Sequence, residues 1–314
     1  MDLTDRVMRC FKPSKVFDNS RELVNSLDFA AAGDFVVTGG SDDQIVLYNS
    51  MYGEQKKISL TKMYGVGQII FGHTSTTVLH SSTKINDTIR YLSLHQNKYI
   101  RYFIGHTNKV TSLIKSPVED IFVSASLDNS LMLWDLRSPN CEAHISVAGR
   151  PVADFDPNGL VLAVGINSKT IKMFDIRNLK NGSFITANYN EYKQYDWTDL
   201  KFSPNGKFII IPSDGPLIKL IDAFNGEPIN SFVGHQNKNS IPVEASFSPD
   251  SKYVISGSND SRIHGWNIKS GSKVCILESY YNGPINCVKF NPKYMMIAST
   301  STNMEFWLPK YNFI

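Results

Sequence analysis

Histidine, serine and aspartate recur together in this chain, and these are the residue types that build a hydrolytic triad. Two sets contain all three types and end in a tryptophan: His106, Ser124, Asp128 and Trp134 in the first, and His235, Ser256, Asp260 and Trp266 in the second. A serine nucleophile of the hydrolase type would sit in an elbow such as Gly-x-Ser-x-Gly, and neither set has one. Because the set recurs with its tryptophan, the pattern favours a repeated structural unit over an active site.

Other motifs for catalysis or cofactor binding are missing from the sequence. There is no phosphate-binding Walker sequence and no His-Glu-x-x-His, and Gly65-Val-Gly67 lacks the third glycine of a dinucleotide fingerprint. The four cysteines are widely spaced and form no Cys-x-x-Cys pair. The sequence therefore predicts no catalytic residue, no cofactor and no metal site.

Composition excludes several further classes of protein. The 314 residues include 32 Lys and Arg against 29 Asp and Glu, which gives a net charge of +3, and 42% are hydrophobic. A protein that coats nucleic acid normally has a strong basic excess, so direct nucleic-acid binding is not expected. Apolar runs such as Phe208–Ile211 are too short to span a bilayer, and the N-terminus has no apolar signal segment. We expect an intracellular protein without direct membrane contact.

A five-residue pattern recurs seven times along the chain: an apolar residue, any residue, an apolar residue, a bulky residue and usually Asp or Asn. The copies begin at Ile45, Ile89, Leu131, Ile171, Ile218, Ile263 and Met304, a spacing of about 43 residues. Apolar residues alternate in every copy except the one that contains Gly265, and this period of two is typical of strands. Turn sequences such as Ser203–Gly206 punctuate the units. The pattern excludes helical arrays and leaves propellers of the kelch or WD40 type.

A Gly-His pair precedes several copies, at Gly72-His73, Gly105-His106 and Gly234-His235. Together with the sets ending in Trp134 and Trp266, these pairs resemble the WD40 family. The resemblance implies that each set forms a buried hydrogen-bonded tetrad. Because seven copies of about 43 residues nearly fill the chain, we expect an all-β fold, a single seven-bladed propeller spanning residues 1–314.

The N-terminal segment is expected to close the ring as the outer strand of the last blade, and Lys15-Val-Phe17 is the best candidate for it. Its basic residues, Arg6, Arg9, Lys12 and Lys15, also fit a phosphate-binding arm. Lysines commonly protect an exposed sheet edge, so the closing strand is the favoured interpretation. Loops that enter the innermost strands are the expected binding sites. Lys109, Arg150 and Asp196 occupy such loops in units three, four and five, where each could equally be an ordinary solvated charge.

Four segments carry a closer resemblance: 84–103, 133–141, 220–224 and 306–309. They resemble the WD repeat-containing protein 82 family, whose members are subunits of COMPASS histone-methyltransferase complexes. Departures from the family pattern are a longer loop between His235 and Val243, and Leu308 where the repeat expects Asp.

The resemblance implies a nuclear, noncatalytic scaffold that binds the N-terminal region of the Set-domain enzyme modifying lysine 4 of histone H3. It further implies a link to the phosphorylated tail of RNA polymerase II, a protein phosphatase 1 complex through the nuclear targeting subunit and, in fungi, the cleavage and polyadenylation machinery. Two alternatives stay open: an adaptor of an unrelated assembly such as a ubiquitin ligase, and an enzyme with a metal or ligand on the ring axis.

Overall fold

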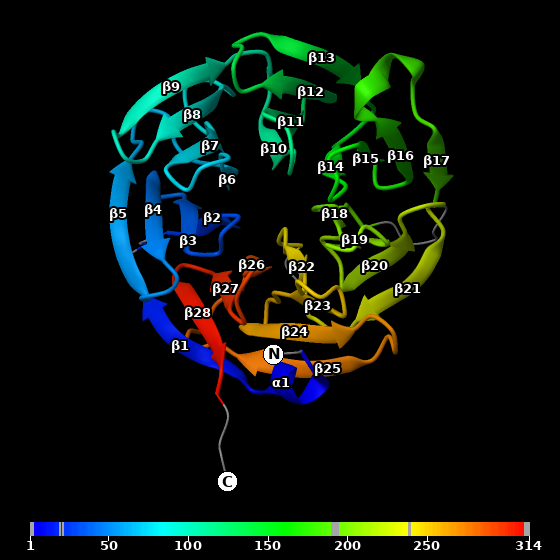
Figure 1. Ribbon diagram of the computed structural model, residues 1–314. Coiled ribbons are helices and arrows are strands. Elements are labelled where there is room, and N and C mark those ends of the chain that lie inside the picture. Colours follow the sequence, from blue (N-terminus) through cyan, green and yellow to red (C-terminus); the bar gives the residue numbers. More distant parts are fainter. Residues whose placement is uncertain (1–2, 19, 21, 190–194, 238–239, 311–314) are drawn as a thin grey trace.

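The computed structural model describes residues 3–18, 20, 22–189, 195–237 and 240–310. Across these residues the strands form seven four-stranded antiparallel sheets arranged around a central axis (Figure 1). This is the predicted seven-bladed propeller. The apolar alternation in each repeat explains the strands, and neighbouring blades pack face to face so that these apolar side chains form the layers between them.

The first three blades, in chain order, have the following strands. Blade 1 contains β2 (Val24–Phe29), β3 (Phe35–Gly40), β4 (Gln44–Asn49) and β5 (Glu54–Leu60). Blade 2 contains β6 (Ile69–Phe71), β7 (Thr77–Ser81), β8 (Ile89–Ser93) and β9 (Lys98–Phe103). Blade 3 contains β10 (Val110–Lys115), β11 (Ile121–Ser126), β12 (Ser130–Asp135) and β13 (Cys141–Ser146).

The remaining four blades repeat this order. Blade 4 contains β14 (Val152–Phe155), β15 (Val161–Ile166), β16 (Thr170–Asp175) and β17 (Ile185–Asn188), with a 3-10 helix, η1 (Ile176–Asn181), before β17. Blade 5 contains β18 (Lys201–Phe202), β19 (Phe208–Pro212), β20 (Leu217–Asp222) and β21 (Pro228–Val233). Blade 6 contains β22 (Ala245–Phe247), β23 (Tyr253–Ser256), β24 (Arg262–Asn267) and β25 (Lys273–Glu278). Blade 7 contains β26 (Cys287–Phe290), β27 (Ile297–Thr300), β28 (Met304–Pro309) and the N-terminal strand β1 (Phe11–Phe17).

Strand β1 closes the ring by pairing antiparallel with β28, so that Phe11 lies opposite Pro309 and Phe17 opposite Met304. This confirms the predicted closure, and the strand begins four residues earlier than Lys15. Phe11 and Phe17 are buried while Lys12 and Lys15 are exposed. Lys12 and Lys15 of the basic N-terminal segment therefore lie on an edge strand of the last blade, whereas Arg6 and Arg9 lie in the short helix that precedes it.

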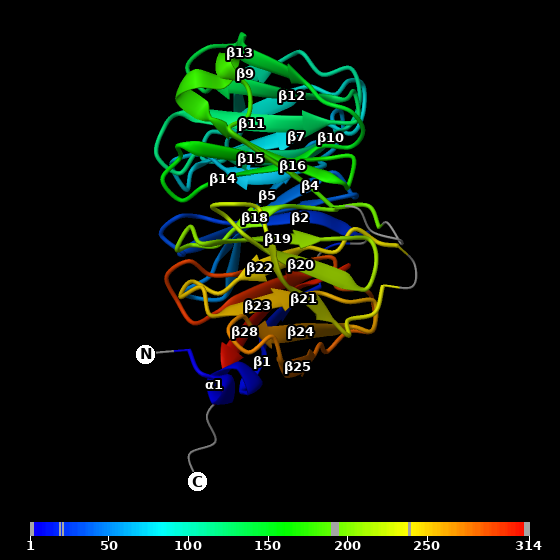
Figure 2. The same ribbon diagram turned by 90° about the vertical axis from the view of Figure 1, so that its right-hand side faces the viewer.

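The core lies between blades as a series of apolar layers. One layer joins Leu79, Ile89 and Phe103 of blade 2 to Phe122 and Trp134 of blade 3. Another packs the short helix α1 (Asp5–Arg9), through Val7 and Met8, against β25. Figure 2 shows the ring from its edge, with α1 beside β1 and β25. None of the helices formed by the described residues is both long and apolar enough to cross a membrane.

The strand order places the loops on two faces. Because successive strands are antiparallel, the loop that enters each innermost strand lies on the same side as the loop between the second and third strands. We call this side the entry face and the other the exit face. The longer loop between His235 and Val243 belongs to the entry face, and its residues 238–239 lie outside the described part of the chain.

Candidate functional site

In blade 3 the four residues of the first set form one hydrogen-bonded chain. His106 Nδ1 lies 2.8 Å from Asp128 Oδ2, and His106 Nε2 lies 2.7 Å from Ser124 Oγ. The indole N–H of Trp134 donates to the same serine oxygen at 2.8 Å. Because an ionised carboxylate only accepts, we place the imidazole proton on Nδ1, and Nε2 then accepts from the Ser124 hydroxyl.

This chain of bonds is enclosed. Ser124 and Trp134 have no exposed surface, and the His106 side chain is 1% exposed. The hydroxyl of Ser124 is bonded on both sides, so it presents no free nucleophile to a substrate. Asp128 also accepts from Ser130 Oγ at 2.6 Å, which fixes the turn between β11 and β12. The arrangement joins the entry loop to the second and third strands of its blade.

Blade 6 does not form the second predicted tetrad. His235 Nε2 lies 3.2 Å from the carbonyl oxygen of Gly215, and Nδ1, although buried, has no partner among the described residues. The Trp266 indole N–H donates to the carbonyl oxygen of Val233 at 3.1 Å instead of to Ser256. The predicted bonds from His235 to Asp260 and from Trp266 to Ser256 are therefore wrong.

The cause is a third histidine, His264, whose side chain bonds to Asp260 in place of His235. Its Nε2 lies 3.1 Å from Asp260 Oδ2 and its Nδ1 lies 3.0 Å from the ammonium of Lys273. In the sheet register His264 stands opposite Ser256, where blade 3 has Met132 opposite Ser124. A methionine cannot compete for a carboxylate in this way, whereas a histidine does. The sequence contained this signal, since His264 lies only four residues after Asp260.

Blade 7 contains a tryptophan–serine bond that the sequence analysis missed. The indole N–H of Trp307 donates to Ser299 Oγ at 2.8 Å, and both residues are buried. Ser299 stands opposite Glu305, two residues before the tryptophan, just as Ser124 stands opposite Met132. The blade lacks a Gly-His pair, so a search that started from histidine could not find it.

Blade 2 has an arginine at the same register position. Arg90 stands opposite His80 and is only 4% exposed. Its guanidinium carbon lies 3.6, 5.8 and 5.2 Å from the ring centroids of three tyrosines, Tyr64, Tyr99 and Tyr102 respectively. Nε donates to Ser82 Oγ at 2.9 Å and Nη2 to Asn86 Oδ1 at 3.1 Å. Stacking on aromatic faces stabilises a buried guanidinium, so this cluster occupies the place of a tetrad.

His80 lies beside this arginine and gives the chain an acid-sensitive position. Burial lowers the pKa of His80 to about 4, and its Nε2 has no hydrogen-bond partner among the described residues. A histidine in an unfolded chain has a pKa of about 6.5. The unfolded state therefore binds the proton more readily, and stability is lost as the pH falls from about 6.5 toward 4.

We expect His80→Leu to remove part of this acid sensitivity. Between about pH 7.5 and about pH 5.5, the wild type should lose about 1 kcal/mol of unfolding free energy more than the variant does. Burial raises the pKa of Asp154 to about 7, which acts in the opposite sense, so the variant must be compared with the wild type at each pH. Urea denaturation at the two pH values measures the difference, and parallel pH dependences would contradict the assignment.

The three predicted partner-binding residues lie on the entry face of successive blades. Lys109 is exposed immediately before β10, and Asp196 is exposed before β18. Arg150, before β14, is half-buried, and its Nε is enclosed without a hydrogen-bond partner in the described part of the chain. The Ser168 hydroxyl donates to Asp196 Oδ1 at 3.5 Å. The three residues thus share one face, and their role in binding stays a prediction.

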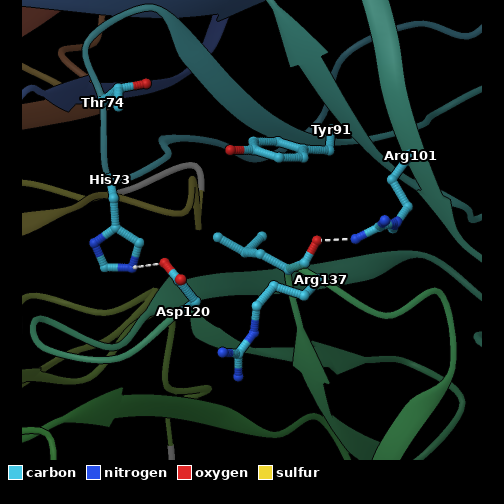
Figure 3. Close-up of a pocket in the computed structure, with 7 residues that line it drawn as sticks. His73, Thr74, Tyr91, Arg101, Asp120 and Arg137 are labelled. Atoms are coloured by element: carbon cyan, nitrogen blue, oxygen red, sulfur yellow. Dashed lines mark hydrogen bonds and ion pairs between the residues drawn. The ribbon is translucent and has the colours of Figure 1, made fainter.

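A cleft of about 440 Å³ opens on the exit face between blades 2 and 3 (Figure 3). Its lining consists of His73, Thr74, Tyr91, Arg101, Asp120, Leu136 and Arg137. The charges are largely paired: His73 Nε2 lies 3.4 Å from Asp120 Oδ1, Arg101 donates to the carbonyl oxygen of Leu136, and Arg137 binds Asp135 at 2.7 Å. The sequence alone does not reveal this cleft, because its residues come from two blades and three loops.

Paired charges lie on and beside the innermost strands of the blades. Lys201 Nζ lies 2.8 Å from Asp199, and Lys289 Nζ lies 3.0 Å from Asp28. Asp28 Oδ2 also accepts the backbone N–H of Phe71 at 2.8 Å, which links blade 1 to blade 2. Within the described ranges, no group of three or more His, Cys, Asp or Glu side chains is placed to hold a metal ion. The Lys289–Asp28 pair joins blade 7 to blade 1, whereas Lys201 and Asp199 lie two residues apart at the start of blade 5.

Comparisons with known proteins agree with this architecture. The family model described as "WD domain, G-beta repeat" matches residues 11–49, 97–135 and 226–267. The chain is 52% identical to WD repeat-containing protein 82 of Drosophila melanogaster, over 98% of this chain and 97% of that protein. It is 31% identical to COMPASS component SWD2 of Saccharomyces cerevisiae, over 91% and 90% of the two chains. It is 32% identical to Set1 complex component swd2 of Schizosaccharomyces pombe, over 84% and 76%.

Proposed function

Because the chain belongs to the WD repeat-containing protein 82 family, we propose that it is a noncatalytic scaffold subunit of a nuclear COMPASS-type histone H3 lysine-4 methyltransferase complex. The observation that carries the proposal is the extent of the similarity. Two fungal relatives named as components of COMPASS or of the Set1 complex align with 91% and 84% of this chain. The similarity therefore extends over most of the ring, far beyond the residues matched to the repeat model.

The geometry supports a scaffold because the residues of blade 3 that resembled a hydrolytic triad are bonded to one another, as are the charged groups of the innermost strands. His106 and Asp128 bind one another, and Lys201 and Lys289 are paired with carboxylates. What the ring offers to other molecules is its rigid display of loops on two faces. In this role Lys109, Arg150 and Asp196 contact a partner on the entry face.

The partners follow from the family. The principal one is the N-terminal region of the Set-domain methyltransferase. Further partners are the phosphorylated tail of RNA polymerase II, the nuclear targeting subunit of protein phosphatase 1 and the cleavage and polyadenylation machinery. Arginine pairs bidentately with phosphate, which suits recognition of a phosphorylated tail.

Affinity purification of the tagged full chain from nuclear extract tests the proposal. We expect a Set-domain methyltransferase to co-purify, together with histone H3 methyltransferase activity that the purified chain alone lacks. A well-folded bait that recovers instead a ubiquitin ligase or another unrelated assembly would overturn the proposal. Once co-purification is seen, binding of the recombinant methyltransferase N-terminal region to the purified chain shows whether the contact is direct.

A further inference from the structure

Four serines of this chain are followed directly by proline, which is the sequence that proline-directed protein kinases modify: Ser116, Ser138, Ser203 and Ser248. Three of them, Ser116, Ser203 and Ser248, have no exposed surface. Ser138 is partly exposed and lies in the loop between β12 and β13. The fold therefore sets one Ser-Pro pair apart from the other three.

The three buried hydroxyls hold together the turns that carry them. Ser203 Oγ donates to Asn205 Oδ1 at 2.7 Å and accepts the backbone N–H of Phe208 at 2.9 Å. Ser116 and Ser248 likewise accept backbone N–H groups of their own turns. A kinase reaches such a hydroxyl only after the turn has unfolded, and a folded chain opens in this way only rarely.

Ser138 has a less constrained hydroxyl in a more open loop. Its Oγ accepts the backbone N–H of Asn140 at 3.2 Å, and it donates no hydrogen bond to any of the described residues. Arg137, Pro139 and Asn140, which flank it, are exposed. The residue before a proline favours an extended backbone, which suits the open substrate groove of a kinase. Exposed loop tips are also the segments of a folded chain that modifying enzymes reach most easily.

The loop that carries Ser138 also forms one wall of the cleft between blades 2 and 3. Arg137, the residue before Ser138, is among the side chains that line it (Figure 3). Two arginines and two aspartates lie in or directly beside the cleft, and their formal charges cancel: Arg101, Arg137, Asp120 and Asp135. A charged group added at Ser138 therefore decides the sign of the charge at this edge of the cleft.

We propose that a proline-directed protein kinase phosphorylates Ser138, and that the phosphate gives the neighbouring cleft an acidic edge. Ser138 Oγ attacks the γ-phosphorus of ATP, the bond from that phosphorus to the β-phosphate oxygen breaks, and ADP leaves. The hydroxyl proton passes to the catalytic base of the kinase. The phosphoserine carries a charge of about −1.5 to −2 at pH 7, so the balance between arginines and aspartates is lost.

Phosphorylation at this position changes what the cleft attracts. The Arg137 side chain is 74% exposed, and a dianionic phosphate on the next residue competes with Asp135 for its guanidinium. Arg101 donates to the carbonyl oxygen of Leu136 and so remains part of the cleft wall. An acidic segment that approaches the modified cleft is repelled, and a basic one is attracted.

A kinase assay on the purified full chain tests the site. The chain is incubated with a cyclin-dependent kinase and with ATP labelled in the γ-phosphate, and the product is mapped by mass spectrometry. We expect about one phosphate per chain, on Ser138, and at least about tenfold less phosphate in Ser138→Ala and in Pro139→Ala. Ser270→Ala is the matched control, because Ser270 is exposed in the corresponding loop of blade 6 but is followed by glycine. The control should be phosphorylated like the wild type.

Cys141, which is exposed at the end of the same loop, reports the charge that the phosphate adds. Phosphorylation should lower the rate at which Cys141 reacts with an anionic disulfide, relative to a cationic one, by about threefold or more. Taking the ratio of the two rates cancels any change in the ionisation of the thiol itself. An unchanged ratio would contradict the effect on charge.

The site assignment fails if the folded chain takes up no phosphate, or if Pro139→Ala is phosphorylated like the wild type. It also fails if Ser116, Ser203 or Ser248 is modified as readily as Ser138. Thermal unfolding of the three variants shows that each ring is folded. The chain isolated from dividing cells should carry phosphate on Ser138 and lose it when proline-directed kinases are inhibited, and a chain unmodified at Ser138 in such cells would overturn the inference.

Discussion

Replacing Phe11 with alanine is expected to lower the free energy of unfolding by about 3–5 kcal/mol. Phe11 is 2% exposed and begins the strand that closes the ring. Its ring meets that of Phe290 edge-on, with centroids 6.1 Å apart, and it lies in the layer that contains Trp307. Removing it leaves a cavity where the two ends of the chain meet, and each blade depends on its neighbours to bury its faces.

Urea denaturation followed by circular dichroism measures this loss. Lys12→Ala is the matched control, because Lys12 is the next residue in the same strand, its side chain is exposed, and its backbone pairs with Leu308. We expect the control to change stability by less than about 0.5 kcal/mol. A Phe11→Ala protein as stable as this control would contradict the view that β1 closes the ring.

The fold could be predicted from the sequence because every repeat shows the same apolar alternation and is bounded by turn residues. The period of two marked the strands, and the spacing of about 43 residues gave the number of blades. The start of β1 was misplaced because Pro13 interrupts the apolar pattern; the register shifts there, between Pro13 and Lys15. Proline lacks a backbone donor and is tolerated at a sheet edge, so the strand continues through it.

The hydrogen-bond networks inside the blades were harder to predict from the sequence, because they depend on which of two side chains binds a shared aspartate. In blade 3 Met132 cannot bind a carboxylate, so Asp128 bonds to His106. In blade 6 the corresponding residue is His264, which bonds to Asp260 and to Lys273. A motif defined only by residue types does not show that two histidines compete for one aspartate. The cleft between blades 2 and 3 was not predicted for a related reason, since residues from separate repeats meet there only in the closed ring.

The difference between blades 3 and 6 leads to the second large effect. His106→Ala should lower the free energy of unfolding by about 1–3 kcal/mol, because it removes both bonds of a buried imidazole and leaves Asp128 and Ser124 without their partner. A double-mutant cycle of His106→Ala and Asp128→Ala should give a coupling free energy of similar size. The same cycle for His235 and Asp260 should give less than about 0.5 kcal/mol, since these side chains do not bond.

Pairing His264 with Asp260 supplies the internal control for this comparison. His264 Nε2 lies 3.1 Å from the carboxylate, so the cycle of His264→Ala and Asp260→Ala should recover a coupling that the His235 cycle lacks. Urea denaturation at about pH 7.5 keeps His235 and His264 neutral, because burial lowers the pKa of both. If His235 and Asp260 proved to be coupled as strongly as His106 and Asp128, both blades would contain the repeated tetrad and His264 would not displace it. If all three cycles gave no coupling, the buried network of blade 3 would position its side chains without adding to the free energy of unfolding.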